Sequence, residues 1–240
     1  MAPVRRQPTR RRDPRETRRR IVEAAVGLFE ANGYPRTTMA DIAGVAGVAI
    51  QTVYFSFHTK AELLMECVLA VGADDPAAPH HRDRPWMREA MSATDPCRQI
   101  ALLVDNGTDI FARISPLMDL VGAALATDAS VRAVWRAKGD ARRDGLRDLL
   151  EVVARSGVLR PEVGVDRGAD IVFGLLGPEM LNLLTVECSW PIERYKAWLN
   201  ETLCQQLLLP GTCPHAGTAR DEASSPPGAL RSAIPRSGGS

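Results

Sequence analysis

Residues 37–60 read TTMADIAGVAGVAIQTVYFSFHTK, and this stretch decides the fold. Thr38 and Asp41 have the spacing of a capping box, in which two side chains satisfy backbone donors at a helix start. Gly47 can adopt the positive φ that a sharp turn between two helices needs. The stretch therefore predicts two short helices joined by a tight turn, with a third helix beginning near Lys60.

The second of these short helices has one apolar face and one mixed face. Val53 and Phe57 stand four residues apart, so both are expected to point into the core. The face left outside carries amide, hydroxyl and aromatic groups from Ile50, Gln51, Thr52 and Phe55. A recognition helix in the major groove of DNA requires a face of this kind.

Lys60 follows directly after this helix. Thr59 and Glu62 have the spacing of a second capping box, which places Lys60 in the first turn of the next helix. A cation there has the wrong sign for the helix dipole, whereas a phosphate bound at the same helix end would account for it. A solvated surface lysine is the alternative. The position next to the turn favours the phosphate contact.

The whole run resembles the DNA-binding domain of TetR-family transcriptional regulators. The resemblance covers residues 18–70 and rests on Thr38, Ile42-Ala43, Ala46-Gly47-Val48, Thr52-Val53-Tyr54, Phe57, Lys60 and Glu62-Leu63-Leu64, with Leu28-Phe29 and Asn32-Gly33-Tyr34 upstream. The chain departs from the family's pattern at Ala49, where serine or threonine is common, and at Ser56, where histidine or tyrosine is common. Losing the hydroxyl at position 49 removes a helix cap worth about 0.5–2 kcal/mol.

The resemblance implies a helix-turn-helix that binds a double-stranded DNA operator. The expected DNA-binding residues are Thr38, Ala49, Ile50, Gln51, Thr52, Tyr54, Phe55, Ser56 and Lys60. Within this set, Gln51 and Thr52 are expected to read base edges, and Ile50 or Phe55 to touch thymine methyl groups. Phosphates are expected to be held by Thr38, Tyr54 and Lys60.

Charge is distributed unevenly along the chain. Residues 1–20 contain nine arginines against Asp13 and Glu16, a net charge of +7, so the remainder carries about −6 of the overall +1. A basic arm on an acidic body indicates an anionic partner at the N-terminal end. Nucleic acid fits better than a membrane, because the arm has no aromatic or apolar anchor. A solvated tail without a partner is the alternative.

The cysteines and the hydropathy indicate the compartment. The five cysteines, at positions 67, 97, 188, 204 and 213, are odd in number and contain no C-x-x-C pair. They predict no disulfide framework and a reducing cytoplasm as the setting. No stretch is expected to reach the length of a membrane span, about 20 apolar residues. We therefore expect a cytoplasmic protein with no membrane partner.

Helical spacing of apolar residues dominates the chain, and alternating strand patterns are essentially absent. The predicted fold is therefore all-α. The predicted divisions are a disordered basic arm (1–14), a three-helix helix-turn-helix DNA-binding domain (15–60), a helical ligand-binding and dimerisation domain (61–209) and a disordered tail (210–240). Residues 73–85 are expected to form a loop, in which His80-His81 have no third metal ligand at a recognisable spacing.

The C-terminal part contains several boundary signals and one long apolar segment. Asp95-Pro96 predicts a helix start, Asp166 a cap, and Pro178 a kink in the helix that follows Asp166. Residues 170–186, DIVFGLLGPEMLNLLTV, are apolar nearly all the way round. Such a helix must be covered on all sides, and a second subunit is the predicted cover. Burial inside the monomer is the alternative.

The resemblance implies a dimeric repressor that a small-molecule effector releases from its operator by shifting a conformational equilibrium. Polar or aromatic groups on otherwise apolar helices are the pocket candidates: Asn106, Trp135, Glu179 and Asn182. Each of them can instead be an ordinary core or surface residue. No buried basic residue is evident, which favours a neutral or cationic apolar effector over a phosphorylated one.

Two other functions remain open at this point. A DNA-binding regulator without a small-molecule switch, constitutive or controlled by a protein partner, would have a filled C-terminal core. An enzyme would need a catalytic motif, and the chain has no G-x-S-x-G, no H-E-x-x-H and no phosphate-binding loop. We therefore expect no enzymatic activity, no catalytic residue, no metal and no cofactor.

Overall fold

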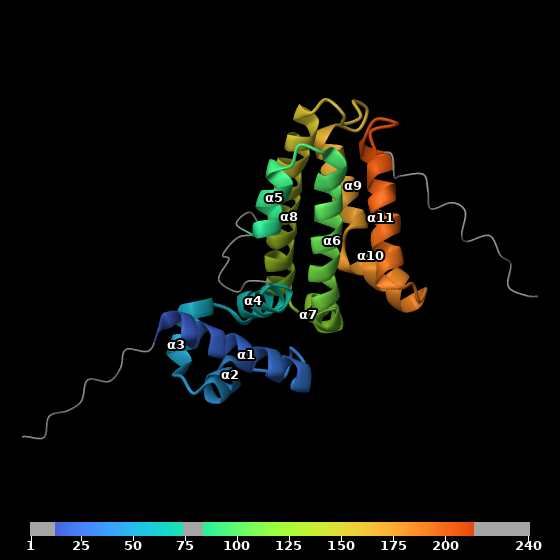
Figure 1. Ribbon diagram of the computed structural model, residues 1–240. Helices are drawn as coiled ribbons and strands as arrows, with labels where there is room; N and C mark the ends of the chain where they lie inside the picture. Colours follow the sequence, from blue (N-terminus) through green and yellow to red (C-terminus); the bar gives the residue numbers. More distant parts are fainter. Residues whose placement is uncertain (1–12, 74–83, 214–240) are drawn as a thin grey trace, which may run out of the picture.

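The computed structural model describes residues 13–73 and 84–213. Within these ranges the chain is helical, and the isolated bridge between Leu159 and Leu208 is the nearest approach to a strand. Figure 1 shows a short N-terminal unit of helices lying against one end of a bundle formed by the later helices. The all-α prediction is confirmed for these residues. The predictions made for residues 1–12, for 74–83 with His80-His81, and for 214–240 lie outside the described residues.

The short unit contains α1 (Pro14–Asn32), α2 (Met39–Ala46), α3 (Ile50–Phe57) and α4 (Lys60–Gly72). The helices that follow begin with α5 (Pro85–Ser92) and α6 (Pro96–Ile114). A 3₁₀ turn (Ser115–Leu117) and α7 (Met118–Thr127) come next. The remaining elements are α8 (Ala129–Arg155), α9 (Gly164–Leu175), α10 (Pro178–Asn182), a π-helical turn (Leu183–Glu187) and α11 (Ile192–Leu207).

Local signals explain where α1 begins and ends. Asp13 accepts a hydrogen bond from the Arg15 N–H at 2.9 Å, and Pro14 occupies the first helical position, where its missing N–H costs nothing. Gly33, with φ of 76°, ends the helix. Three side chains one turn apart, Ile21, Ala25 and Phe29, are buried, so α1 forms the floor of the short unit.

The buried apolar side chains form two clusters. The first joins α1–α4 to α7 and the start of α8, because Val121 and Val131 are fully buried in it together with Leu63 and Leu64 of α4. The second fills the bundle of α5, α6, α8, α9, α10 and α11. α4 therefore packs both against α1 and α3 and against the bundle, which makes it the connection between the two parts.

Two boundary predictions in the bundle are wrong, and one is confirmed. Asp95 caps α6 by accepting from the Cys97 N–H at 2.9 Å, as expected. Asp166 does not cap α9, which begins at Gly164; its carboxylate instead accepts from Arg147 Nε at 2.6 Å. Pro178 does not kink one long helix but starts a new one, because α9 ends at Leu175 and the axis then bends by 41°.

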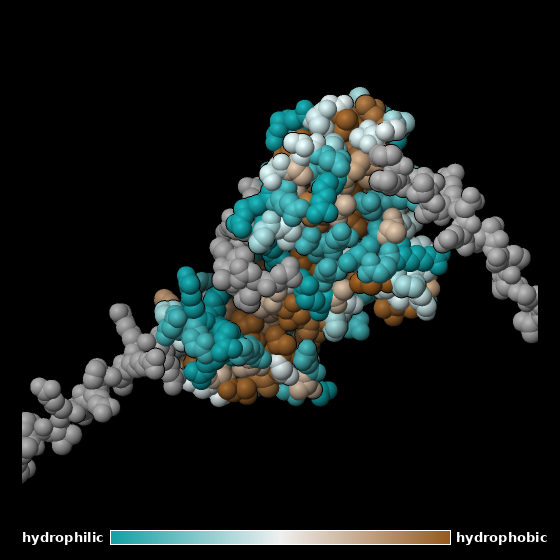
Figure 2. All heavy atoms as spheres, in the orientation of Figure 1, coloured by the Kyte–Doolittle hydropathy of each residue, from teal (hydrophilic) through white to brown (hydrophobic). Residues whose placement is uncertain are grey.

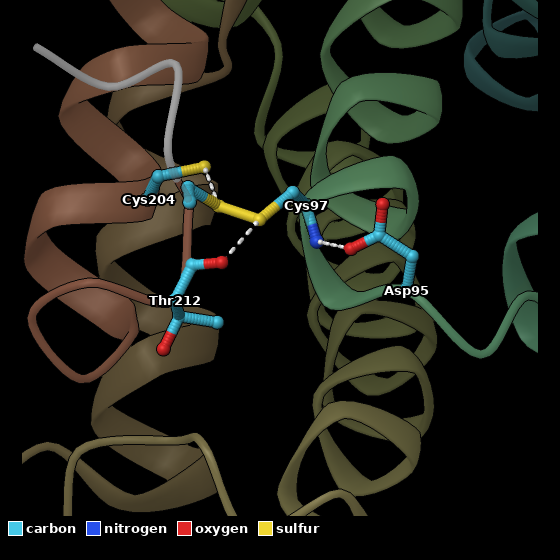
Figure 3. The surroundings of a disulfide bond; sticks show 5 residues. Asp95, Cys97, Cys204 and Thr212 are labelled. Atoms are coloured by element: carbon cyan, nitrogen blue, oxygen red, sulfur yellow. Dashed lines mark hydrogen bonds between the residues drawn. A yellow bond between two sulfur atoms is a disulfide. The ribbon is translucent and has the colours of Figure 1, made fainter.

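Three of the five cysteines meet at one end of the bundle. Cys97 at the start of α6 forms a disulfide with Cys213 beyond α11, and their Cα atoms are 5.8 Å apart. Cys204 of α11 places its sulfur 3.3 Å from that of Cys213 (Figure 3). The prediction that the cysteines form no disulfide is wrong for this pair. The two residues are 116 positions apart, and only the packing of α6 beside α11 brings them together.

The expectation that no stretch approaches a membrane span also needs correction. The helical run Pro96–Thr127 is long and apolar enough to cross a membrane by length and composition alone. Two bent helix pairs, Met39–Ala46 with Ile50–Phe57 and Gly164–Leu175 with Pro178–Glu187, meet the same criterion when each pair is counted as one span. An unbroken apolar run is not needed for this, because hydropathy averaged along a helix tolerates isolated charged or polar residues.

Candidate nucleic-acid interface

The turn between α2 and α3 has the geometry of a helix-turn-helix. The two helix axes meet at 111°, within the range of about 90–120° typical of this motif. Gly47 adopts the left-handed conformation (φ 62°, ψ 42°) and ends α2. Arg20 of α1 donates to the Ala46 carbonyl, and a Cβ on Gly47 would lie 2.9 Å from Arg20 Nη2. Glycine is therefore needed here both for its backbone conformation and for the close approach of this arginine.

The faces of α3 divide largely as the sequence predicts. Val53 and Phe57 are buried in the first cluster, and Gln51 and Tyr54 are exposed. Phe55 is 87 % exposed, so its ring is accessible to a partner. Ile50 is not on the outside as expected. It is half-buried against the first cluster.

Two further positions of the expected contact set lie on α3 or at its start. Ala49 occupies the N-cap position and makes no side-chain cap, so the expected loss of the cap is confirmed. Thr52 is half-buried, and its carbonyl accepts a hydrogen bond of 2.8 Å from the Ser56 hydroxyl. Ser56 is thus engaged with its own helix. The side chains of α3 most available to DNA are Gln51, Tyr54 and Phe55.

Thr38 forms the predicted capping box at the start of α2. Its hydroxyl oxygen accepts from the Asp41 N–H at 3.1 Å, and the Asp41 carboxylate accepts from the Thr38 N–H at 3.0 Å. The Thr38 hydroxyl also donates to Asp41 Oδ2 at 2.7 Å. These hydrogen bonds lower the pKa of Asp41, the hydroxyl bond first. The phosphate contact predicted for Thr38 stays a prediction.

Lys60 has internal partners that the sequence did not reveal. Its ammonium donates to the carbonyls of Tyr34 at 2.9 Å and Thr37 at 3.1 Å, and lies 4.1 Å from the centre of the Tyr34 ring. Burial lowers the pKa of this amine, and the Asp128 carboxylate opposes that shift. The positive charge of Lys60 at a helix start can therefore be explained without DNA, because two carbonyls and the face of an aromatic ring compensate it. The phosphate contact predicted for Lys60 remains a proposal.

Arg18 holds the far end of α3 in place, a role that no local pattern in the sequence indicated. Its guanidinium lies 4.3 Å from the centre of the Phe57 ring, and donates to the Ser56 carbonyl at 2.9 Å and to Glu66 at 2.8 Å. Glu66 of α4 also lies 3.9 Å from Lys138 of α8. A cavity of about 280 Å³ at this junction is lined by Arg18, Phe57, His58, Glu66, Val134 and Lys138. The recognition helix is therefore connected to the bundle through α4.

The four pocket candidates do not gather in one place. Trp135 packs against the first cluster, near the DNA-binding helices. Asn106 donates to the Leu102 carbonyl of its own helix at 2.8 Å, and Asn182 accepts from the Ser115 hydroxyl at 2.6 Å. Glu179 is exposed. A second cavity, of about 510 Å³ between α5 and α8, contains none of the four. Their assignment to an effector pocket stays a proposal.

A basic residue inside the bundle corrects the expectation that none is present. Arg142 of α8 lies with its guanidinium 4.0 Å from the centre of the Phe173 ring and 5.0 Å from that of Phe111. It donates to the carbonyls of Phe173 at 2.8 Å and Leu176 at 3.3 Å. Burial lowers the pKa of Arg142 to about 10, although the Glu179 carboxylate raises it. The premise that favoured a neutral or cationic effector therefore fails.

Comparison with known proteins places this interface in a family. The family described as "Bacterial regulatory proteins, tetR family" matches residues 21–67, a range that begins within α1, contains α2 and α3, and ends within α4. This part of the chain has the sequence of a TetR-family DNA-binding domain. The protein is a helix-turn-helix transcriptional regulator, and the predicted resemblance is confirmed.

Relatives extend beyond the DNA-binding helices. The chain is 28 % identical over 208 residues to the Pseudomonas putida protein named "Probable HTH-type transcriptional regulator ArpR", covering 82 % of this chain and 95 % of that one. It is also 28 % identical over 193 residues to the HTH-type transcriptional regulator TtgR of Pseudomonas putida, covering 74 % and 89 %.

Solved structures of similar fold include two regulators. The SmeT–triclosan complex has a TM-score of 0.61 at 18 % identity and covers 92 % of this chain and 99 % of its own. NalD, described as the secondary repressor of the MexAB-OprM multidrug efflux pump in Pseudomonas aeruginosa, has a TM-score of 0.57 at 19 % identity, covering 82 % and 98 %. These likenesses show that the TetR fold extends through the bundle.

Proposed function

We propose that this TetR-family regulator is a homodimeric repressor in the cytoplasm, released from its operator by a small-molecule effector. The observation that carries the DNA-binding part is the exposed face of α3, where Gln51, Tyr54 and Phe55 are accessible on a helix whose other face is buried in a helix-turn-helix. Gln51 and Thr52 read base edges and Phe55 contacts thymine methyl groups. Ile50 contributes less than predicted, because part of its surface is already used in the core.

A second subunit is supported by apolar surface at one corner of the bundle. Leu183 is 43 % exposed and Val186 is 67 % exposed, both on the π-helical turn that follows α10. Figure 2 shows hydrophobic surface at this corner. A TetR-family dimer places two recognition helices on successive turns of one DNA face, about 34–36 Å apart. Covering Leu183 and Val186 with a second copy explains why residues 170–186 are apolar on nearly every side.

The route for effector release runs through α6 and α4. A Cβ on Gly72, at the end of α4, would lie 3.1 Å from Ile114 and 3.2 Å from Ile110 of α6. Arg113 of α6 donates to the Gly72 carbonyl at 3.0 Å. A ligand that shifts α6 must therefore also shift the end of α4, whose start is joined to the helix-turn-helix. The effector lowers DNA affinity only as far as it prefers the shifted state.

The relatives indicate the class of effector. SmeT has been solved with triclosan, and NalD is described as a repressor of a multidrug efflux pump. We propose an apolar drug-like effector and expression control of an export function. An aromatic molecule carrying an anionic or hydrogen-bond-accepting group would match the chemistry of the Phe111 and Phe173 rings and the Arg142 guanidinium, which pack against one another in the structure.

A regulator without a small-molecule switch is the second candidate. Tight packing inside the bundle favours it, because Leu176 lies against Gly107 so closely that a Cβ there would approach within 2.7 Å. The two candidates differ in one measurement. Triclosan, added to the protein bound to fluorescent operator DNA, is expected to lower the anisotropy at a concentration that leaves the protein folded.

Failure of a panel of apolar drugs to release the DNA would favour the regulator without a small-molecule switch. Dimerisation is tested separately by sedimentation, with Leu183→Glu expected to give monomers. Leu69→Glu is the matched control, since Leu69 has nearly the same exposure, 44 %, but lies on α4. Equal dimerisation of both variants would contradict the proposed interface.

A further inference from the structure

Three sulfur atoms gather at the end of the bundle farthest from the DNA-binding helices. Cys97 begins α6, Cys213 follows α11, and the two are joined by a disulfide. The thiol of Cys204 lies 3.3 Å from the Cys213 sulfur, on the other side of it from Cys97 in Figure 3. Cys97 and Cys213 are half-buried, whereas Cys204 is buried. Cys97 and Cys213 are therefore partly open to solvent, whereas Cys204 is not.

The surroundings give the three sulfurs different reactivity. Cys97 lies in the first turn of α6, where the Asp95 carboxylate accepts from its N–H at 2.9 Å, and it is half-buried. Burial raises the pKa of the Cys204 thiol to about 11, and the Asp95 carboxylate adds to this effect. In the reduced protein the half-buried Cys97 is therefore the more accessible nucleophile, and the buried Cys204 is the weaker one at neutral pH.

We propose that Cys97, Cys204 and Cys213 form a reversible thiol–disulfide site that exchanges with small disulfides of the glutathione class. Only the expectation that this disulfide is reversible rests on the cytoplasmic location proposed above. Disulfides that form in a reducing compartment are usually transient and redox-responsive rather than permanent. The remaining cysteines, Cys67 and Cys188, are free and have no place in this site.

The exchange takes place in two steps, in which atoms and electrons balance. The Cys97 thiolate attacks one sulfur of the small disulfide, forms a mixed disulfide and releases one small thiolate. Cys213 then gives up its proton to water and attacks the Cys97 sulfur, which forms the Cys97–Cys213 bond and releases the second small thiolate. Each released thiolate takes up a proton, so two protein thiols are oxidised by two electrons and one small disulfide is reduced to two thiols.

Cys204 provides an alternative partner for Cys213. Attack of Cys204 on the Cys213 sulfur breaks the Cys97–Cys213 bond, forms a Cys204–Cys213 bond and expels the Cys97 thiolate, which takes up the proton that Cys204 loses. The bond thereby moves from between α6 and the C-terminal segment to within that segment. The Cys97–Cys213 bond connects α6 to the segment after α11, whereas the Cys204–Cys213 bond spans nine residues and leaves α6 unlinked. The site thus has an α6-linked oxidised form and two forms in which α6 is free.

Equilibration of the full-length protein with glutathione and its disulfide at a series of ratios tests the site. Free thiols are then alkylated, and the bonds are mapped by mass spectrometry of peptides. The Cys97–Cys213 bond is expected to pass from absent to nearly complete within the range of ratios that this couple spans. In Cys97→Ser, the Cys204–Cys213 bond is expected to form instead. Cys188→Ser is the matched control and should titrate as the wild type does.

Three results would overturn the proposal. A Cys97–Cys213 bond that persists in the folded protein at the most reducing ratio would be a permanent structural disulfide and not an exchanging one. Full alkylation of Cys97 and Cys213 at the most oxidising ratio would mean that no disulfide site exists. Cys97→Ser protein in which Cys213 carries only glutathione would remove Cys204 from the site. Because none of these readouts involves DNA, they are independent of the proposed repressor function.

Discussion

The phenol of Tyr34 donates a hydrogen bond of 2.9 Å to Oδ2 of Asp128, across 94 residues of sequence. Tyr34 follows α1 in the DNA-binding unit, and Asp128 caps α8 in the bundle by accepting from the Ser130 N–H. The same tyrosine ring receives the Lys60 ammonium on its face. This pair is thus a second connection between the two parts of the molecule, in addition to the contacts that Glu66 makes.

Replacing Tyr34 by Phe removes this hydrogen bond and leaves the buried ring. The free energy of unfolding is expected to fall by about 1 kcal/mol, since the acceptor is a charged but partly solvated carboxylate. Urea denaturation measures the change. Tyr54→Phe is the matched control, because Tyr54 is 49 % exposed on α3, and its stability should equal that of the wild type. Equal losses in both variants would mean that the Tyr34–Asp128 bond contributes nothing specific.

The same pair predicts a dependence of stability on pH. Hydrogen bonds from Ser130 and then Tyr34 lower the pKa of Asp128 from 3.8 to about 2. A carboxyl whose pKa is lowered in the folded state stabilises it above its unfolded pKa, and this stabilisation is lost as the pH falls from about 4 towards 2. The stability difference between wild type and Asp128→Asn should therefore be constant between about pH 5 and 8, above the window set by that shift.

Below about pH 4 the wild type and Asp128→Asn should converge, because the protonated carboxyl loses the advantage of its charge. Denaturation midpoints on both sides of this pH provide the measurement. A constant difference down to about pH 3 would show that Asp128 acts through its shape as a helix cap rather than through its charge.

Replacing Lys60 distinguishes a structural role of its ammonium from a contact with DNA. Lys60→Met keeps the apolar stem but removes the ammonium from the Tyr34 and Thr37 carbonyls, and should lower the free energy of unfolding by about 1 kcal/mol. If the ammonium also holds a phosphate when DNA is bound, the variant will in addition show a shallower dependence of affinity on salt. Unchanged stability with a shallower salt dependence would show that DNA, and not the carbonyls, is its main partner.

Arg142 is expected to be a structural requirement of the bundle. Arg142→Ala leaves the Phe173 and Leu176 carbonyls without this donor and removes the cation from between two rings, so a loss of about 2 kcal/mol is expected. Thermal or urea unfolding measures it. Arg136→Ala, an exposed arginine on the same helix, should change stability by less than about 0.5 kcal/mol. A neutral result for Arg142→Ala would show that water replaces the guanidinium without cost.

Features encoded within a few residues could be predicted from the sequence. The capping box of Thr38 and Asp41 and the ends of α1 depend on contacts between residues at most four apart, and the positive φ of Gly47 is a property that glycine itself allows. Helical spacing in turn assigned Val53 and Phe57 to the buried face of α3. For the candidate interface, this spacing placed Gln51 and Phe55 correctly on the outside, whereas Ile50 and Thr52, which it also placed there, are half-buried.

Features that depend on distant partners could not be predicted. The Cys97–Cys213 pair, the Tyr34–Asp128 bond and the carbonyl partners of Arg142 join residues brought together only by helix packing. The cap predicted at Asp166 was wrong for the same reason, because its carboxylate accepts a hydrogen bond from Arg147 of α8 instead. The carbonyl partners of Lys60 in the α1–α2 connection were not foreseen either, and its phosphate contact stays a prediction.

Binding of the purified protein to fluorescent DNA from upstream of its own gene, at two salt concentrations, tests sequence-specific recognition by α3 most directly. The wild type is expected to bind tightly, with a strong preference over an unrelated duplex and a steep loss of affinity with salt. Gln51→Ala should lose about 1–3 kcal/mol of discrimination at one position of each half-site. Equally weak binding of the wild type to both duplexes, or a Gln51→Ala variant that weakens every sequence alike, would contradict recognition through this face of α3.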